Sequence, residues 1–324
     1  MSQYKIVITD YYYPDLNEEY SVFKRLGGDV EIVDCTKIIP GGVKEPGEIK
    51  KYVKDADALI VQFAKIDADV ISSMQKCKVI ARYAIGVDTI DLEAAAKKNI
   101  YVANVPDYCI DEVANTAIAH ILNAMRKITE SRDLLLKKAF TYDAVRPIKR
   151  LSECTLCLLG FGNIARDVAR KMASFVKRIV VFDPYFIQKD AYDWVSFLQL
   201  DKALSLADVI SIHVPLSSTT RGLLSKSEFA RMKDGIVIVN TARGGIIDED
   251  FLIKALESGK VAYAGLDVIS SEDFAGSVLL NHPKVALTPH IGWCSEDAVK
   301  ELQRKTAENV VSALLDGRPI YCVR

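Results

Sequence analysis

Three side chains in the second half of the sequence could together perform acid–base chemistry on a small anionic substrate. Each comes shortly after a short apolar run: Arg243 after Ile236–Val239, Glu272 after Ala262–Leu266, and His290 after Val285–Leu287. The planar guanidinium of an arginine suits bidentate binding of a carboxylate. A carboxylate bonded to an imidazole favours the protonated imidazole, which can then donate a proton near neutral pH. Such a set is what hydride transfer to a 2-keto acid requires beside the hydride donor.

A glycine motif indicates where a dinucleotide could supply that hydride. Gly160 and Gly162 follow the apolar run Thr155–Leu159 and open an amphipathic helical pattern. Gly160 can make a tight turn, and Gly162 lets the backbone approach a pyrophosphate at the helix N-terminus. Asp183 ends the next predicted strand, where an acid can bind the adenosine ribose and repel a 2′-phosphate. A glycine turn with a surface aspartate is the plain alternative, but the ordered pattern favours an NAD site.

The elements that must position these residues fall into two series of alternating strands and helices. Such alternation predicts parallel sheets covered on both faces, and hence an α/β protein of two doubly wound domains. A long helical pattern over Asp111–Lys127 lies between the two series, and another over Ser295–Leu315 follows the second. The sequence has no Gly/Ser-rich linker. The predicted strands are Lys5–Thr9, Val30–Val33, Ala58–Val61, Val79–Ala81 and Tyr101–Ala103, then Thr155–Leu159, Ile179–Phe182, Val209–His213, Ile236–Asn240, Ala262–Asp267 and Val285–Thr288.

Composition narrows the class of protein. The 324 residues carry 42 basic and 43 acidic side chains, a net charge of −1, so no basic excess favours nucleic acid. No apolar run has the length of a membrane span, and residues 1–10 enter a predicted strand without a signal-peptide pattern. Seven cysteines, mostly scattered, are expected to be reduced, in a cytoplasmic protein. Cys154 and Cys157 form a CxxC without further metal ligands, and their strand spacing should place them on opposite faces, so no metal is expected.

Over nearly its whole length the chain resembles the D-isomer-specific 2-hydroxyacid dehydrogenases. The resemblance implies a flavodoxin-like substrate domain, 1–103 plus 294–324, and a Rossmann NAD domain, 104–293, with the active site in the cleft between them. The matching segments are Arg82–Asp91, Gly160–Ala165, His213–Leu216, Asn240–Gly245, Gly265–Val268 and Thr288–Gly292.

The resemblance also implies a role for each matching residue. Arg243, Glu272 and His290 would form the catalytic triad, and Asp267 would contact the nicotinamide carboxamide. The backbone amides around Ile85 and Gly86 would bind the substrate carboxylate, with Arg82 and Trp293 also at the substrate. The residues expected at NAD are Gly160, Gly162, Asn163, Ile164, Asp183, His213, Thr241, Ala242, Asp267 and Gly292.

Within the family, the segment 290–298 is similar to the branch that includes the C-terminal-binding protein corepressors, and the chain is also similar to phosphoglycerate dehydrogenases. Trp293 either lines the substrate pocket, as in the corepressor branch, or packs at a domain seam. Three departures from the family pattern are Ala84 for a glycine, Asn115 for a glutamate and Asp273 for a proline. They could alter the carboxylate site, a contact near the nicotinamide or between domains, and the loop of Glu272.

The expected activity is therefore NAD-dependent interconversion of a small 2-keto acid and its D-2-hydroxy acid, by a homodimer formed through the cofactor domain. An alternative is an NAD(H)-sensing, corepressor-like binding protein, against which the intact triad argues. The glutamate at position 272, where a formate dehydrogenase has glutamine, argues against that enzyme, and the triad disfavours an adenosylhomocysteine hydrolase. The sequence leaves the choice among hydroxypyruvate, glyoxylate, pyruvate and larger or phosphorylated keto acids open.

Overall fold

The computed structural model describes residues 3–138, 141–271 and 273–323. The chain divides into two compact units, Met1–Tyr108 with Ser295–Arg324 (unit 1) and Cys109–Cys294 (unit 2). The boundaries lie a few residues from the expected domain limits of 103 and 294. Within the described ranges, no helix is both long enough and apolar enough to cross a membrane.

Unit 1 is built on a five-stranded parallel sheet in the order β2-β1-β3-β4-β5. This order is that of flavodoxin-like folds, in which the chain starts inside the sheet and winds outward in both directions. The strands β3 and β4 are buried at every residue, as expected for strands covered on both faces. The strands are β1 Tyr4–Ile8, β2 Val30–Asp34, β3 Ala58–Val61, β4 Val79–Arg82 and β5 Tyr101–Ala103.

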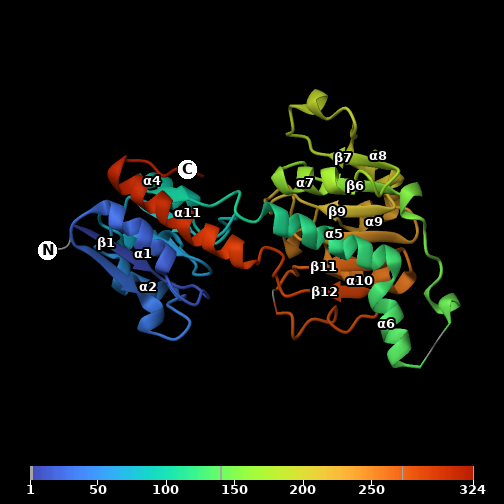
Figure 1. The fold of residues 1–324 in the computed structure, drawn as a ribbon, viewed down its shortest axis with the longest axis horizontal. Helices are drawn as coiled ribbons and strands as arrows, with labels where there is room; N and C mark the ends of the chain where they lie inside the picture. The colour runs from blue at the N-terminus through green and yellow to red at the C-terminus, as the bar shows by residue number, and fades with distance from the viewer. Residues whose placement is uncertain (1–2, 139–140, 272, 324) are drawn as a thin grey trace. The chain divides into compact units, whose positions relative to one another are not determined.

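Helices cover both faces of this sheet. Helices α1 and α11 lie side by side, with α11 packed on β4 (Figure 1). Apolar side chains of α2, α3 and α4 join those of β1, β3 and β4 in one buried cluster on the other face. The side chain of Ser295 accepts from the Ala298 N–H and so caps the start of α11. The helices are α1 Asn17–Phe23, α2 Pro46–Val53, α3 Ala68–Ser73, α4 Leu92–Lys97 and α11 Glu296–Leu315.

Unit 2 contains a seven-stranded parallel sheet in the order β12-β11-β10-β9-β6-β7-β8. Counted from β6, this is the Rossmann order 3-2-1-4-5-6 with one further strand, and the direction of winding reverses between β6 and β9. The strands are β6 Thr155–Leu159, β7 Arg178–Phe182, β8 Ser196–Phe197, β9 Val209–Ile212, β10 Ile236–Asn240, β11 Val261–Leu266 and β12 Val285–Leu287.

Two buried clusters lie on the two faces of this sheet. One joins α5 and α7 to the strands, and the other joins α8, α9 and α10 to them. The helices of unit 2 are α5 Ile110–Arg126, α6 Ile128–Leu136, α7 Asn163–Met172, α8 Leu200–Leu206, α9 Lys226–Arg231 and α10 Glu249–Ser258. Short 3-10 turns across the chain are η1 Lys24–Leu26, η2 Cys35–Lys37, η3 Tyr142–Val145, η4 Leu151–Glu153, η5 Lys189–Tyr192 and η6 Gly244–Ile246.

The predicted fold class, two doubly wound parallel-sheet domains, is confirmed. The structure adds β8, an edge strand of two residues that is too short to give a periodic signal. It also adds α6, which has no buried residue and therefore no apolar stripe that a pattern could detect.

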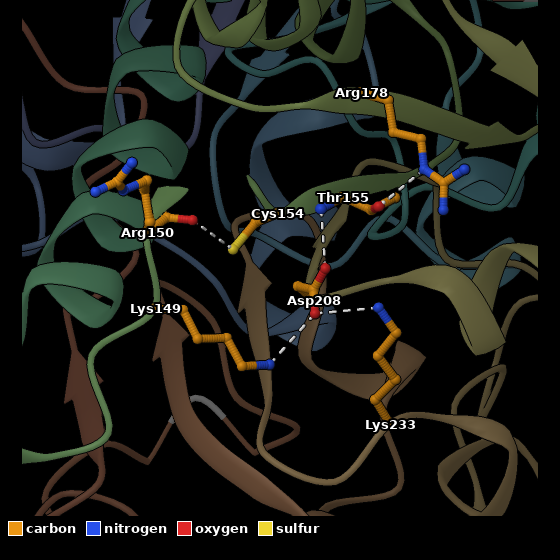
Figure 2. Close-up of polar contacts among 7 residues, drawn as sticks. All are labelled: Lys149, Arg150, Cys154, Thr155, Arg178, Asp208 and Lys233. Carbon is orange, nitrogen blue, oxygen red and sulfur yellow. Dashed lines mark hydrogen bonds and ion pairs between the residues drawn. The ribbon is translucent and has the colours of Figure 1, made fainter. Parts of the chain in front are cut away.

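The two cysteines of the CxxC lie in different clusters, as their strand spacing predicted. Cys154 packs with the α5 and α7 cluster, whereas Cys157 packs with the α8 to α10 cluster. The Cys154 thiol donates to the carbonyl oxygen of Arg150 at 3.3 Å (Figure 2). Burial raises the pKa of Cys157 to about 12, so it remains a thiol. None of the seven cysteines, all of which lie in the described ranges, forms a disulfide bond.

Asp208 ties together the amino ends of several strands of unit 2 (Figure 2). Its carboxylate accepts from the Thr155 N–H at 2.9 Å and from the ammonium groups of Lys233 and Lys149 at 3.1 and 3.3 Å. Burial alone would raise the pKa of Asp208, but the Thr155 N–H and the charge of Lys233 hold it below its usual value. This carboxylate therefore stabilises the edge of the sheet opposite the one that carries the predicted site.

Candidate active site

The predicted site residues of unit 2 lie at one edge of its sheet. All seven strands are parallel, so their carboxyl ends meet there. The residues that follow β6, β7, β9, β10, β11 and β12 at this edge are Gly160, Asp183, His213, Thr241 to Arg243, Asp267, and Thr288 to Trp293. In open α/β sheets, ligands bind at this edge, beside the point where the winding reverses.

Gly160 is required by the backbone that surrounds it. Its φ is +90°, in the region that favours glycine. A Cβ at this position would lie 2.8 Å from the carbonyl oxygen of His213, so the turn after β6 packs directly on the end of β9. The predicted tight turn is therefore present, and two neighbouring strand ends fix its shape.

Gly162 has a different reason to be glycine. Its φ of −70° is open to any residue, and an added Cβ would meet no other atom within 4 Å. Gly162 is the N-cap of α7, and no side chain of the described residues caps the amides of that helix. The protein's own packing thus leaves exposed N–H groups beside an open surface, which suits a bound pyrophosphate. Asn163 stands at the same turn, where its side-chain oxygen accepts from the Arg166 guanidinium.

Asp183 reaches back to the glycine turn. Its Oδ2 accepts from the Phe161 N–H at 2.8 Å, while Oδ1 accepts from the N–H groups of Tyr185 and Phe186. Beside it opens a cavity of about 370 Å³, lined by Phe182, Asp183, Pro184, Phe197, Leu198, Gln199 and Lys202. A partly exposed acid at the rim of a cavity, next to the glycine turn, fits the adenosine half of NAD.

His213 is neutral in this setting. Burial lowers the pKa of His213 to about 4, and its Nε2 lies 2.9 Å from the Ser211 hydroxyl. Its backbone N–H donates to the Leu159 carbonyl oxygen at 2.7 Å. His213 therefore supplies no positive charge to the glycine turn, and its carbonyl group defines the space at Gly160.

The turn that carries Arg243 is held by a side chain within it. Asn240 ends β10 with no solvent exposure, its amide donates to the Arg243 carbonyl oxygen at 2.9 Å, and its Oδ1 accepts from the Ala242 N–H at 3.0 Å. The Arg243 guanidinium donates to the Ala242 carbonyl oxygen at 2.8 Å. A Cβ at Gly244 would lie 2.0 Å from the carbonyl carbon of Ile269. The Arg243 turn and the loop after β11 are thus in direct backbone contact.

Asp267 organises the loop that carries His290. This carboxylate is 2% exposed and accepts from the Thr288 hydroxyl at 2.6 Å, the Ile291 N–H at 3.0 Å and the Gly292 N–H at 2.8 Å. The His290 N–H donates to the Asp267 carbonyl oxygen, and the Asp267 N–H donates to the Asn240 carbonyl oxygen. The loops of Arg243 and His290 are therefore connected through one residue. Contact of Asp267 with the nicotinamide stays a prediction.

His290 adopts an uncommon backbone conformation, with φ at +54°. Its carbonyl oxygen accepts from the indole N–H of Trp293 at 2.9 Å. Trp293, which was expected either in the substrate pocket or at a seam, thus also fixes the backbone of His290. Strained residues of this kind persist where surrounding contacts determine them, often at functional sites.

His120 of α5 lies beside this loop. It is 6% exposed, and its Nε2 lies 3.3 Å from the Thr288 hydroxyl. Burial lowers the pKa of His120, although the charge of Asp267 acts in the opposite direction. Because the Thr288 hydroxyl donates to Asp267, it accepts from a neutral His120 that carries its proton on Nε2.

Thr241 offers the cofactor a polar atom that has no partner among the described residues. It is 9% exposed, and its hydroxyl makes no hydrogen bond to any described residue. A buried hydroxyl without a partner is costly, and a ligand at this edge would relieve that cost. With the exposed α7 amides and the Asp183 cavity, this atom fits NAD. Among the described residues, no three His, Cys, Asp or Glu side chains are grouped as a metal site requires.

In unit 1, the predicted carboxylate site lies in the loop after β4. Arg82 is 8% exposed, and its guanidinium donates to the carbonyl oxygens of Gln62 at 3.1 Å and Gly86 at 2.8 Å. It therefore shapes the loop from inside the protein, and its expected contact with the substrate stays a prediction. The carbonyl oxygen of Ile85 accepts from the Asn104 amide at 2.6 Å.

The three departures from the family pattern take ordinary structural roles where the structure describes them. Asn115 donates to Asp111 and accepts from Lys171 of α7. The Asp273 carboxylate accepts from the Gly276 N–H at 3.1 Å and so forms a turn without proline. Ala84 accepts from the Val105 N–H at 3.0 Å. The third expected catalytic residue, Glu272, lies outside the described residues.

Sequence reasoning missed the residues that hold the loops of Arg243 and His290. Asn240 was only part of a motif, and Thr288 had no assigned role. A signal existed for Asn240, because it is a polar residue at the end of the apolar run Ile236–Val239. The signal was weak, since an asparagine after a strand is also common in turns.

Comparison with known proteins decides the family. Residues 118–292 match the family described as "D-isomer specific 2-hydroxyacid dehydrogenase, NAD binding domain". The chain belongs to this family. The matched residues make up most of unit 2, so this unit is the NAD-binding domain of a D-2-hydroxyacid dehydrogenase.

Relatives of this dehydrogenase include several named enzymes. It is 37% identical over 274 residues to a hydroxypyruvate reductase of Thermotoga maritima, which covers 83% of this chain and 89% of that protein. It is 35% identical over 314 residues to a D-3-phosphoglycerate dehydrogenase of Methanocaldococcus jannaschii, covering 96% of this chain and 57% of that protein. The chain spans about half the length of the D-3-phosphoglycerate dehydrogenases that it matches.

Solved structures agree with the fold. One of them is a D-lactate dehydrogenase from Aquifex aeolicus, complexed with NAD and lactic acid. The match has a TM-score of 0.83 and 26% identity, and it covers 97% of this chain and 98% of the Aquifex chain. The expected family, the α/β fold of two doubly wound domains, NAD as the cofactor and the class of NAD-dependent oxidoreductases are confirmed.

Proposed function

We propose that this dehydrogenase reduces a small 2-keto acid to the D-2-hydroxy acid with NADH, and catalyses the reverse reaction. The observation that supports this best is the connection through Asp267. The Asp267 N–H donates to the carbonyl oxygen of Asn240, where the Arg243 turn begins. The carbonyl oxygen and the carboxylate of Asp267 accept from N–H groups of the His290 loop. A guanidinium and an imidazole are thereby supported by one residue at the edge where NAD binds in this fold.

Each group would have one role in the reaction. The guanidinium of Arg243 would hold the substrate and polarise its carbonyl, which lowers the cost of negative charge developing on that oxygen. His290 would donate a proton to the same oxygen, and Glu272 would favour the protonated imidazole. When bound, NADH supplies the hydride that reaches the carbonyl carbon. The proton returns to His290 in the direction of oxidation.

NAD would be held by the elements that follow β6, β7 and β9 to β12. The α7 amides at Gly162, Asn163 and Ile164 would bind the pyrophosphate, and Asp183 would bind the adenosine ribose. Gly160 and His213 would shape the turn beneath it. Toward the nicotinamide we place Thr241, Ala242, Asp267 and Gly292.

The substrate carboxylate would be bound by the amides near Ile85 and Gly86 of unit 1, with Arg82 supporting that loop. Among the described residues, the N–H groups of Ile85, Gly86 and Val87 have no partner within the protein. Adjacent free N–H groups are suitable donors to a carboxylate. We propose that Trp293 serves the substrate indirectly, by holding His290.

Hydroxypyruvate is the first substrate to test, since a relative that matches 83% of this chain and 89% of its own length is named a hydroxypyruvate reductase. We further propose a homodimer formed through unit 2. Apolar side chains are exposed around α6 and the segment after it, as an interface would require: Ile128, Leu135, Leu136 and Ile148.

A keto-acid panel tests the proposal. The protein is mixed with NADH, or with NADPH as control, and hydroxypyruvate, glyoxylate, pyruvate or 3-phosphohydroxypyruvate, and the absorbance of the nicotinamide is followed. We expect turnover with NADH and a clear preference over NADPH. Tight NADH binding without turnover of any keto acid would contradict the proposal and favour an NAD(H)-sensing binding protein.

A further inference from the structure

The loop Tyr83–Gly86 of unit 1 is held by its backbone carbonyl groups. The Ile85 oxygen accepts from the Asn104 side-chain amide at 2.6 Å, and the Gly86 oxygen accepts from the Arg82 guanidinium at 2.8 Å. Side chains that are themselves fixed in the protein therefore determine how two successive peptide planes are turned.

The orientation of these planes sets the direction of the N–H groups. In a planar trans peptide the C=O of one residue and the N–H of the next point in opposite directions. Because Asn104 binds the Ile85 oxygen, the Gly86 N–H points away from Asn104. The Val87 N–H points away from Arg82 for the same reason. Each bond to a carbonyl oxygen thus fixes the direction of the N–H group that follows it in the chain.

Asn104 is in turn fixed by helix α11. The amide of Asn309, which has no solvent exposure, donates to the Asn104 carbonyl oxygen at 2.9 Å. The Oδ1 of Asn309 accepts from the Tyr321 N–H at 2.8 Å. The C-terminal segment and α11 therefore support one end of the loop through two asparagines.

A second chain of hydrogen bonds supports the other end of the loop. Tyr83 is 2% exposed, and its hydroxyl donates to the Glu19 carboxylate of α1 at 2.6 Å. Gln303 of α11 donates to the same carboxylate at 3.1 Å and to the Asp15 carbonyl oxygen at 2.8 Å. Glu19 itself has no solvent exposure, so its carboxyl group depends on these partners.

We propose that Asn104 and Glu19 are positioning residues, which hold the Tyr83–Gly86 loop in the form whose N–H groups bind the substrate carboxylate. This inference rests on the proposed function, since it assigns the purpose of the loop. A buried carboxyl group lowers stability unless it is well paired, and a leucine of similar volume would avoid that cost. The geometry gives the buried Glu19 carboxyl group a function that compensates for this cost in stability. Its hydrogen bond with Tyr83 fixes the residue that begins the loop.

Four variants separate positioning from general stability. Tyr83→Phe removes only the hydroxyl that binds Glu19, and Asn104→Ala removes the amide that binds Ile85. Tyr263→Phe is the matched control for the first, because Tyr263 is 1% exposed in unit 2 and also hydrogen-bonded by a side chain. Asn123→Ala is the control for the second, because Asn123 likewise binds backbone, at the Thr129 N–H.

The measurements are KM and kcat with the best keto acid of the panel, NADH affinity by fluorescence, and the Tm of each variant. We expect KM to rise about three- to tenfold in Tyr83→Phe and Asn104→Ala, as the loss of one hydrogen bond implies. The NADH affinity of both variants should stay within about twofold of the wild type, because the two hydrogen bonds lie in unit 1 and NAD binds to unit 2. The controls should change Tm without this rise in KM.

Two outcomes would overturn the inference. One is an unchanged KM in both loop variants, and the other is an equal rise of KM in the controls. Binding of oxamate in the presence of NADH, measured by calorimetry, gives the same comparison when turnover is slow. A wild-type protein that neither turns over any keto acid nor binds oxamate contradicts the proposed function itself, and the inference with it. Normal turnover in the wild type with unaltered variants contradicts the inference alone.

Discussion

The backbone N–H of His290 donates to the carbonyl oxygen of Asp267 at 2.8 Å, and His290 is held at a φ of +54°. A residue other than glycine in this region costs about 1 kcal/mol or more, so its neighbours must stabilise it. The Asp267 carboxylate and the Trp293 indole supply those contacts. The direction of the proposed proton donor therefore depends on residues that need not touch the substrate.

Replacing Trp293 by Phe tests this dependence. The change keeps an aromatic ring but removes the N–H that binds the His290 carbonyl oxygen. We expect kcat with a keto acid to fall about three- to tenfold, the effect of one lost hydrogen bond, while NADH binding is retained. Trp194→Phe, at the other tryptophan, is the control. Equal kcat values in wild type and Trp293→Phe would show that the indole N–H is unimportant.

Replacing Gly244 by Ala tests the contact between the Arg243 turn and the loop after β11. The new Cβ would lie 2.0 Å from the Ile269 carbonyl carbon, so one of the two backbones must move. We expect the free energy of unfolding to fall by about 1–3 kcal/mol, together with a loss of kcat. Gly47→Ala, where the added Cβ meets nothing within 4 Å, is the control. Wild-type stability in Gly244→Ala would contradict the described contact.

Gly162→Ala should have the opposite profile. The added Cβ meets no protein atom within 4 Å, and the backbone conformation allows alanine, so we expect no loss of Tm. It would instead occupy the space beside the α7 amides and raise the Kd for NADH at least about tenfold. Thermal unfolding and fluorescence titration measure the two effects. A variant with unchanged NADH affinity would place the pyrophosphate elsewhere.

Stability should depend on pH through Glu19. Burial raises the pKa of Glu19 from 4.5 to about 7, although the bonds from Tyr83 and Gln303 act in the opposite direction. The folded state thus keeps a proton that the unfolded state loses, and stability falls as pH rises from about 4.5 to 7, by on the order of 3 kcal/mol.

The variant Glu19→Gln should lose this dependence. Urea unfolding at pH 5, 6, 7 and 8 would show the variant gaining stability relative to the wild type as pH rises, with the difference constant above pH 7. A constant difference across the whole range would mean that Glu19 is ionised throughout.

The sequence predicted the strands well because a buried parallel strand is a continuous apolar run, as in Ile236–Val239. It also predicted the glycine turn, since strand, turn, helix and acid follow one another along the chain. The role of Arg82 was less accessible. An arginine after a strand could face a ligand or the protein, and only the positions of Gln62 and Gly86 show that it binds backbone.

The same limit applies to His290 and Asp267. Their hydrogen bond joins the ends of two strands that are distant in the sequence. The left-handed conformation of His290 occurs at this contact, so no local pattern could reveal it. Asn240 and Glu19 were missed for a similar reason. Their importance lies in partners that the fold brings near, and single residue types do not encode those partners.

The most direct test of the central claim follows the hydride. The protein is incubated with hydroxypyruvate or pyruvate and with NADH that carries two deuterium atoms at C4 of the nicotinamide, and the variants His290→Ala and Arg243→Ala are treated in the same way. Chiral chromatography with mass spectrometry then reads the product. We predict the D-2-hydroxy acid with deuterium at C2 from the wild type, and loss of product in both variants with NADH binding retained. An L product, or near-normal turnover in either variant, would contradict the account.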